Sequence, residues 1–181
     1  MVVTMIALLV STACAGEGGS SGEAPDRTTT GSTTVRANAT ASLAETAVPI
    51  DVAAELGSET YRSSGAGECT HAEAASIRGV PAAMWSVRYS GTGPMDHMRV
   101  TVWRPAGGGV DQLSLTVRAG RSSHRIDTVA GTERMGSGAV TVRPASGGGA
   151  RIDVDGRDAE GSTVRLTITC ARLTPAVAEG G

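Results

Sequence analysis

Three histidines and several carboxylates are the residues most able to bind a metal ion. His71, His97 and His124 would have to converge with carboxylates such as Asp96 or Asp127 to hold a cation. No two of the histidines have the short spacing that zinc-ligand motifs use. We therefore expect surface histidines, no metal site and no cofactor.

Nucleophilic catalysis has little support in the chain. There are many serines but no Gly-x-Ser-x-Gly elbow, and Ser137 lies between two glycines, which is more typical of a hairpin loop. All the basic residues are arginine, so lysine-based Schiff-base or general-base chemistry is excluded. These absences predict a protein that is not an enzyme, with a hydrolase as the weaker alternative.

A run of alternating carboxylates resembles the acidic start of a calcium loop. Asp153, Asp155, Asp158 and Glu160 follow one another closely, but the EF-hand spacing is absent. Asp153 and Asp155 would fall on the polar face of a strand that runs into an Asp-Gly turn. A solvated strand face is therefore favoured over a metal site.

Aromatic residues are the remaining candidates for ligand contact. Only Tyr61, Trp85, Tyr89 and Trp103 are present, and Trp103 is predicted on the strand face opposite the apolar residues of 98–102. An exposed indole near Tyr89 could stack on a sugar or hold an apolar ligand. Trp103, Trp85 and Tyr89 are therefore the ligand-binding candidates, although burial of Trp103 under a second layer is the favoured alternative.

Composition limits the fold and the partners. The chain has 181 residues and a net charge of -2, which leaves room for one ordinary domain and offers no excess of positive charge to nucleic acid. Phenylalanine is absent, so the core must be mostly aliphatic and would gain from a covalent cross-link. We expect a monomer that binds no nucleic acid.

The N-terminus is typical of a lipoprotein export signal. An apolar run over 2–10, too short to span a bilayer, is followed by Ser11-Thr12-Ala13-Cys14-Ala15. Small residues before Cys14 suit lipoprotein processing and thioether attachment of diacylglycerol to its sulfur. Ser11 replaces the usual leucine and no basic residue precedes the apolar run, so ordinary cleavage near Ala13 or Ala15 stays the alternative.

Composition also divides the chain into segments. We expect a signal at 1–14, a flexible Gly/Ser/Thr-rich tether at 15–47, a β domain at 48–175 and a disordered tail at 176–181. The tether is too poor in large apolar residues to offset its ordering entropy. It would act as a spacer between the membrane and the β domain.

Alternation of apolar and polar residues dominates the β domain and predicts strands with one buried face. The apolar members are Trp85, Val87 and Tyr89; Met98, Val100 and Val102; Leu113, Leu115 and Val117; Val140 and Val142; Ile152 and Val154; and Val164, Leu166, Ile168 and Cys170. Glycine-rich turns separate these runs, which favours an antiparallel β-sandwich or small meander barrel. The Ala-rich stretch 70–77 is the one expected short helix, with a loop as the alternative.

The cysteines divide into one near the signal and two around the patterned sequence. In an exported chain the pair Cys69 and Cys170 predicts a disulfide, with two buried free thiols as the alternative, and leaves Cys14 for lipidation. The bond would close a loop of about one hundred residues and remove roughly 4 to 5 kcal/mol of unfolded-state freedom.

The order of these features resembles a known family. Cys14 with its Ser/Thr/Gly tether, Cys69-Thr70 with the Ala-rich stretch after it, and Leu166-Thr167-Ile168-Thr169-Cys170 are similar to the mycobacterial nineteen-kilodalton lipoprotein antigen family. The resemblance spans most of the chain, but the central strands match only in pattern. It implies a cell-envelope lipoprotein with an adhesin-like or host-recognised surface and no catalytic residues.

The leading hypothesis is a noncatalytic envelope domain, held at a membrane by lipid outside the cytoplasm, that binds a ligand or has a structural role. Ala15 after the cysteine would favour the outer membrane over the outer face of the cytoplasmic membrane where two membranes exist. The alternative is a carrier of a lipid, glycolipid or other apolar ligand between the sheets. The ligand would be a glycan, a lipid or a protein.

Overall fold

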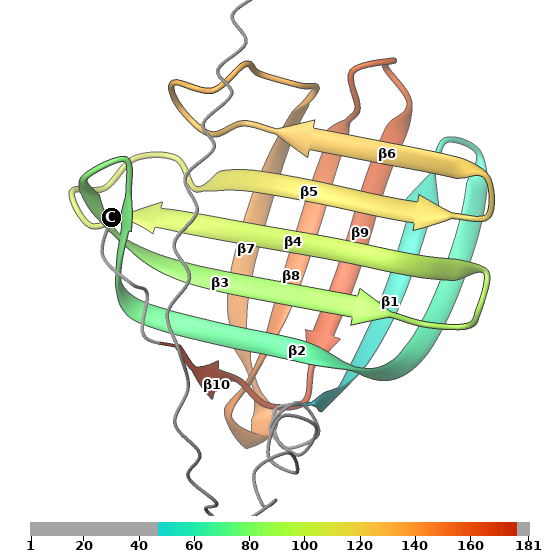
Figure 1. Ribbon diagram of the computed structural model, residues 1–181, viewed down its shortest axis with the longest axis horizontal. Coiled ribbons are helices and arrows are strands. Elements are labelled where there is room, and N and C mark those ends of the chain that lie inside the picture. Colours follow the sequence, from blue (N-terminus) through green and yellow to red (C-terminus); the bar gives the residue numbers. More distant parts are fainter. Residues whose placement is uncertain (1–46, 177–181) are drawn as a thin grey trace, which may run out of the picture. The chain divides into compact units, whose positions relative to one another are not determined.

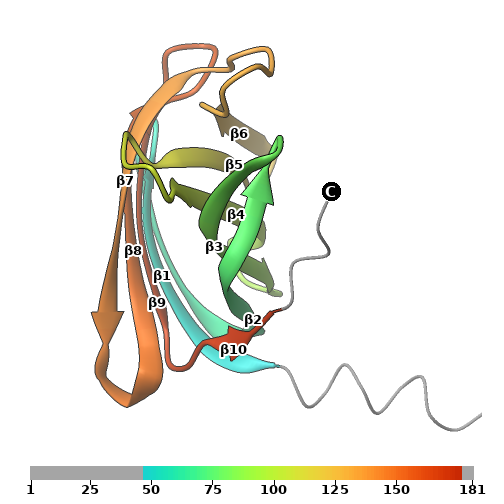
Figure 2. The same cartoon turned by 90° about the vertical axis from the view of Figure 1, so that its left-hand side faces the viewer.

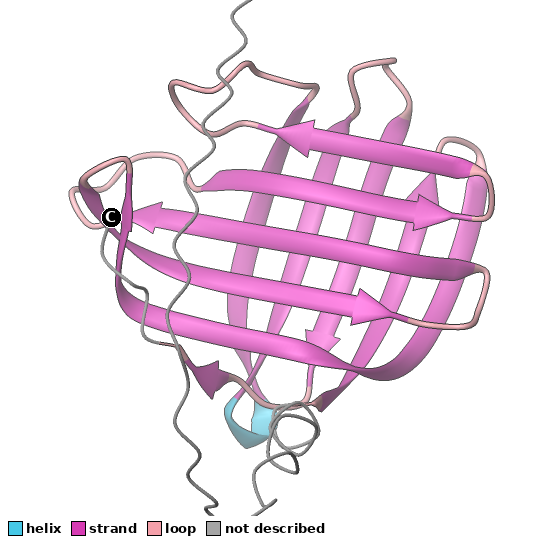
Figure 3. Cartoon of the chain, viewed as in Figure 1, coloured by secondary structure: helices cyan, strands magenta, loops and turns pink. Residues whose placement is uncertain are grey.

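The computed structural model describes residues 47–176, and their strands form one sheet folded into two layers (Figures 1 and 3). We call the layers back and front as they lie in Figure 1. The back layer holds β1 (Val48–Leu56), β7 (Ser137–Ala145), β8 (Gly149–Arg157) and β9 (Thr163–Cys170). The front layer holds β3 (Val80–Ser90), β4 (Met95–Pro105), β5 (Gln112–Ala119) and β6 (Ser122–Asp127). β2 (Glu59–Ile77) belongs to both layers, and the short β10 (Thr174–Pro175) pairs with its second half.

The strand order is β6-β5-β4-β3-β2-β1-β9-β8-β7, and every neighbouring pair in it is antiparallel. The strands of the two layers cross steeply in Figure 1, and Figure 2 shows from the side that the layers face each other. The two ends of this order meet through one bridge between Asp127 and Met135, so the sheet is nearly a closed barrel. The all-β prediction is confirmed, with an architecture between the expected sandwich and barrel.

β2 passes from the back layer to the front layer at Gly67. Gly67 pairs with Val48 of β1 on one side and with Tyr89 of β3 on the other. A side chain there would collide with the Arg88 carbonyl oxygen and lie 2.7 Å from Ile50 Cδ1. Glycine is therefore required where the strand bends around the corner.

The expected short helix at 70–77 is wrong, because these residues form the second half of β2. Arg78 and Gly79 both have positive φ, which is the backbone of a tight two-residue hairpin turn. This turn pairs Ile77 with Val80 and fixes the register between β2 and β3. Tertiary pairing thus overrides the helix propensity of the alanines, and a register irregularity between Ala72 and Ala75 breaks the alternation that would have indicated a strand.

The core lies between the layers and consists almost wholly of aliphatic side chains. The alternating positions of β4, β5, β8 and β9 point inward as predicted. Met98, Val100, Val102, Leu113, Leu115, Val117, Ile152 and Ile168 have no exposed surface. Val140 and Val142 of the edge strand β7 are half-buried against this core.

The predicted signal at 1–14, Cys14 and nearly all of the predicted tether and tail lie outside the described residues. The strands themselves run from Val48 to Pro175. No helix within residues 47–176 is long and apolar enough to cross a membrane.

Candidate functional site

The outer face of the back layer carries a regular grid of polar side chains. In β1 the inward residues alternate with Asp51, Ala53 and Glu55, which point outward. Register places Arg62 of β2 and Thr167 of β9 on either side of Ala53. Small and large side chains therefore stand next to each other on this face, which makes it uneven.

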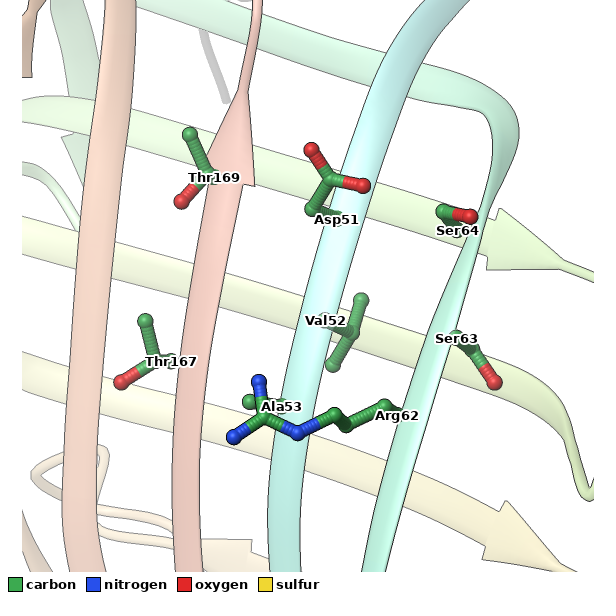
Figure 4. Close-up of a pocket in the computed structure, with 8 residues that line it drawn as sticks. All are labelled: Asp51, Val52, Ala53, Arg62, Ser63, Ser64, Thr167 and Thr169. Carbon is green, nitrogen blue, oxygen red and sulfur yellow. The ribbon is translucent and has the colours of Figure 1, made fainter.

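A depression of about 410 Å³ is centred on Ala53 (Figure 4). Ala53 forms its floor because its methyl group is much shorter than the neighbouring side chains. The walls are polar and come from three adjacent strands: Arg62 and Ser64 of β2, Asp51 of β1, and Thr167 and Thr169 of β9. Figure 4 shows the Arg62 guanidinium lying across Ala53 towards β9.

Arg62 and Asp51 are both exposed, and among residues 47–176 neither forms an ion pair or a side-chain hydrogen bond. Thr167 differs, because its hydroxyl donates to Asp153 Oδ1 at 2.9 Å. The depression thus combines one cation, one anion and hydroxyl groups. Such a set both donates and accepts hydrogen bonds.

A second depression, of about 430 Å³, continues from the first across β9 and β8. The two share Ala53, Arg62 and Thr167. Tyr61 of β2 also borders the second depression, but its side chain shares the inner face with Ala54 and is half-buried against the core, where its hydroxyl donates to the Glu59 carboxylate. Hydrogen bonding to Glu59 raises the pKa of Tyr61, so the phenol stays protonated at neutral pH.

The carboxylates of β8 are held by arginines on this face. Arg165 lies 3.2 Å from Glu55 and 3.5 Å from Asp155, while Arg151 lies 3.0 Å from Asp153. The hydrogen bond from Arg151, helped by Thr167, holds the pKa of Asp153 below its usual range despite partial desolvation. No group of three metal-ligating side chains occurs within residues 47–176. The interpretation of Asp153 and Asp155 as a strand face is therefore the one that the contacts support.

The candidate aromatic residues have contacts within the domain. Trp85 stacks on His71 with ring centroids 4.7 Å apart, and the Arg104 guanidinium lies 5.0 Å from the indole centroid. These neighbours come from the strands on either side of β3, so both faces of the indole are covered. A ligand-binding role for Trp85 stays a prediction, without an open ring face to support it.

Trp103 and Tyr89 also pack against the protein. Trp103 is half-buried against a small cluster of Ile77, Ala82 and Val129, apart from the main core. Tyr89 is 2% exposed, and its hydroxyl donates to the Ser64 carbonyl oxygen at 3.4 Å. Tyr89 lines a further depression beside the turn at 90–94. Their roles in binding stay predictions.

The expectation of surface histidines is wrong for His124. Its side chain is 12% exposed, and Nδ1–H donates to Asp158 Oδ2 at 2.7 Å. Burial alone would raise the pKa of Asp158, but the hydrogen bonds from His124 and from the Ser162 amide outweigh it and lower the pKa. Asp158, expected among solvated carboxylates, is buried because the turn between β8 and β9 folds over β6.

Cys69 and Cys170 form the predicted disulfide, with their Cα atoms 6.2 Å apart. Cys170 points inward as its alternation predicts, and both residues have no exposed surface. The bond lies where β2 has just entered the front layer and β9 ends. It links two sequence-distant strands at the end of the domain where β1 begins.

The residues of the Ala53 depression were not among the predicted site residues. The sequence pattern of β1 does indicate a half-buried strand, because every second residue is apolar: Val48, Ile50, Val52, Ala54 and Leu56. What the sequence does not show is which strands lie beside β1. Arg62 and Thr167 are more than one hundred positions apart in the chain and meet only through β1.

No family model, curated protein or solved structure matches this chain.

Proposed function

We propose that this protein is a noncatalytic, lipid-anchored domain of the cell envelope that binds a ligand on the outer face of its back layer. The observation that carries the binding role is the depression at Ala53, where Arg62 and Asp51 stand exposed beside hydroxyl groups without an ion-pair partner among the described residues. Elsewhere on the same face the arginines hold the carboxylates. Unpaired opposite charges in a depression leave hydrogen-bonding capacity for a ligand.

Export supports this proposal through the cysteines. A disulfide between Cys69 and Cys170 suits an oxidising compartment outside the cytoplasm. Diacylglycerol on Cys14 would supply two acyl chains, which suffice for stable membrane attachment. Relationship to the nineteen-kilodalton lipoprotein antigen family is part of the same proposal, and it carries no catalytic residue onto this chain.

Anchoring is tested by fractionating cells that express the full chain or the Cys14→Ser variant. We expect the wild-type protein with the membranes and Cys14→Ser in the soluble exported fraction. Ser20→Ala, in the predicted tether, is the matched control and should stay with the membranes. Membrane association of Cys14→Ser equal to that of the wild type would contradict the anchor.

Carriage of an apolar ligand between the layers receives no support from the core. Met98 and Leu115 of the front layer and Ile168 of the back layer are fully buried in one core cluster. Aliphatic side chains therefore already occupy the space between the layers. Native mass spectrometry of the freshly purified protein would detect a bound lipid. We expect the mass of the protein alone.

A further inference from the structure

The geometry points to a neutral carbohydrate as the ligand of the depression at Ala53, held by Arg62, Asp51 and the hydroxyls of Ser64, Thr167 and Thr169. The inference rests on the proposed binding function and names its ligand class. It depends on three features of the site: the balance of charge, the mixture of donors and acceptors, and the small floor.

Charge selects against ionic ligands. The depression has one guanidinium, that of Arg62, and one carboxylate, that of Asp51. An anion would be attracted by Arg62 but repelled by Asp51, and a cation would meet the reverse, so neither gains much net attraction. A neutral ligand has no such penalty.

Hydrogen-bonding chemistry selects a ligand with several hydroxyls. A guanidinium only donates, a carboxylate only accepts, and the hydroxyls of Ser64, Thr167 and Thr169 do both. Adjacent hydroxyls of a sugar ring can donate to Asp51 and accept from Arg62 at the same time. Apolar ligands would leave these groups desolvated without partners, which is costly.

Shape allows more than one sugar ring. The floor at Ala53 is continuous with the second depression, which reaches Ala139 and Thr141 of β7. The two depressions measure about 410 and 430 Å³, each within the usual range for small-ligand sites. An oligosaccharide therefore fits this face better than a monosaccharide.

The test uses the full-length Cys14→Ser chain, purified from the exported fraction, on an array of gluco-, manno-, galacto- and arabino-oligosaccharides with sulfated and sialylated glycans beside them. The best neutral ligand is then titrated by calorimetry. We expect Arg62→Ala and Asp51→Asn each to weaken binding about tenfold or more, because each removes a charge-assisted hydrogen bond. Ala53→Gln should abolish binding by filling the floor.

Arg118→Ala is the matched control, since Arg118 is an exposed arginine of the front layer, paired with Asp96. It should leave the affinity unchanged, and thermal unfolding of every variant checks that the fold is intact. Binding only of sulfated or sialylated glycans, or of no glycan, would overturn the assignment of a neutral carbohydrate. Neutral-glycan binding that Arg62→Ala and Ala53→Gln leave unchanged would overturn this site and the proposed binding face with it, whereas the absence of any glycan binding would overturn only the ligand class.

Discussion

The domain has two corners where its layers meet, and they are fastened in different ways. At the first corner β2 runs continuously from one layer to the other, and the disulfide Cys69–Cys170 lies beside its bend. At the second corner no strand is continuous, because the sheet order ends in β6 on one side and β7 on the other. The covalent link therefore lies at the corner that a continuous strand already joins.

The second corner, which we call the seam, depends on the fit of side chains. Ile126 of β6 is fully buried, with Cδ1 over the cross-strand pair Gly138 and Gly156. Backbone hydrogen bonds of 2.8 and 3.1 Å join Asp127 to Met135 beside it. The His124–Asp158 pair, in which Asp158 is buried and His124 partly buried, holds the turn of β8 and β9 against β6. The disulfide therefore limits the unfolded chain, whereas the seam determines whether the sheet stays closed.

The largest expected effect comes from removing the disulfide in the Cys69→Ala/Cys170→Ala variant. The cysteines are 101 positions apart, so the free energy of unfolding should fall by about 4 to 5 kcal/mol in the chain-entropy model. Urea unfolding measures the loss, and the wild type in reductant should match the variant. In both proteins the amides at the seam should exchange only through global unfolding. A loss below about 1 kcal/mol would show that the bond does little to the unfolded chain.

A smaller effect is expected at the seam from Gly156→Ala. The new methyl would collide with the Ser137 carbonyl oxygen and come within 2.9 Å of Ile126 Cδ1. Overpacking of this kind should cost about 1 to 3 kcal/mol, measured by urea unfolding. Amides of β6 should exchange faster than those of β1, because the seam opens locally.

Gly138→Ala is the matched control for Gly156→Ala. A methyl at Gly138 would lie 3.6 Å from Ile126 Cδ1 and 3.3 Å from the Asp155 carbonyl oxygen, so only a small adjustment is needed. Alanine also restricts the unfolded chain more than glycine. Equal destabilisation by the two variants would contradict the proposed role of Gly156 at the seam.

The first corner was more predictable from the sequence than the seam. Cys69 and Cys170 are recognisable as a pair in an exported chain, and the alternation around Cys170 predicts that its side chain points into the core. The seam depends on Gly138 and Gly156. An isolated glycine in a strand can mark a bend or leave space for a side chain of another strand, and the sequence does not distinguish the two.

The residues of the candidate site differ in the same way in how far the sequence predicts them. The alternation of β9 shows that Thr167 and Thr169 face away from the core, but not that β1 and Arg62 lie beside them. His124 looked like a surface residue because its partner Asp158 is far away in sequence and faces it only once the sheet closes. Local patterns thus predict the strands and their buried faces. Contacts across the sheet require the strand order.

The smallest expected effect, and the sharpest test of the seam, is the pH dependence of Asp158→Asn. Asp158 Oδ2 accepts from His124, and Oδ1 accepts from the Ser162 amide at 2.8 Å. Asparagine keeps an acceptor but loses the charge, so the free energy of unfolding at neutral pH should fall by about 1 to 2 kcal/mol.

The sign of the pH effect follows from the lowered pKa of Asp158. Its ionised form is favoured by folding, so the stabilisation is complete above its ordinary value of 3.8 and is lost as the pH falls through the lower folded value. The difference between wild type and Asp158→Asn should therefore be present at about pH 5 and shrink below 3.8. Asp96→Asn, at an exposed pair with Arg118, is the control and should show no resolvable loss in physiological salt. A difference between wild type and Asp158→Asn that persists at pH 2 would mean that the seam uses the shape of this side chain and not its charge.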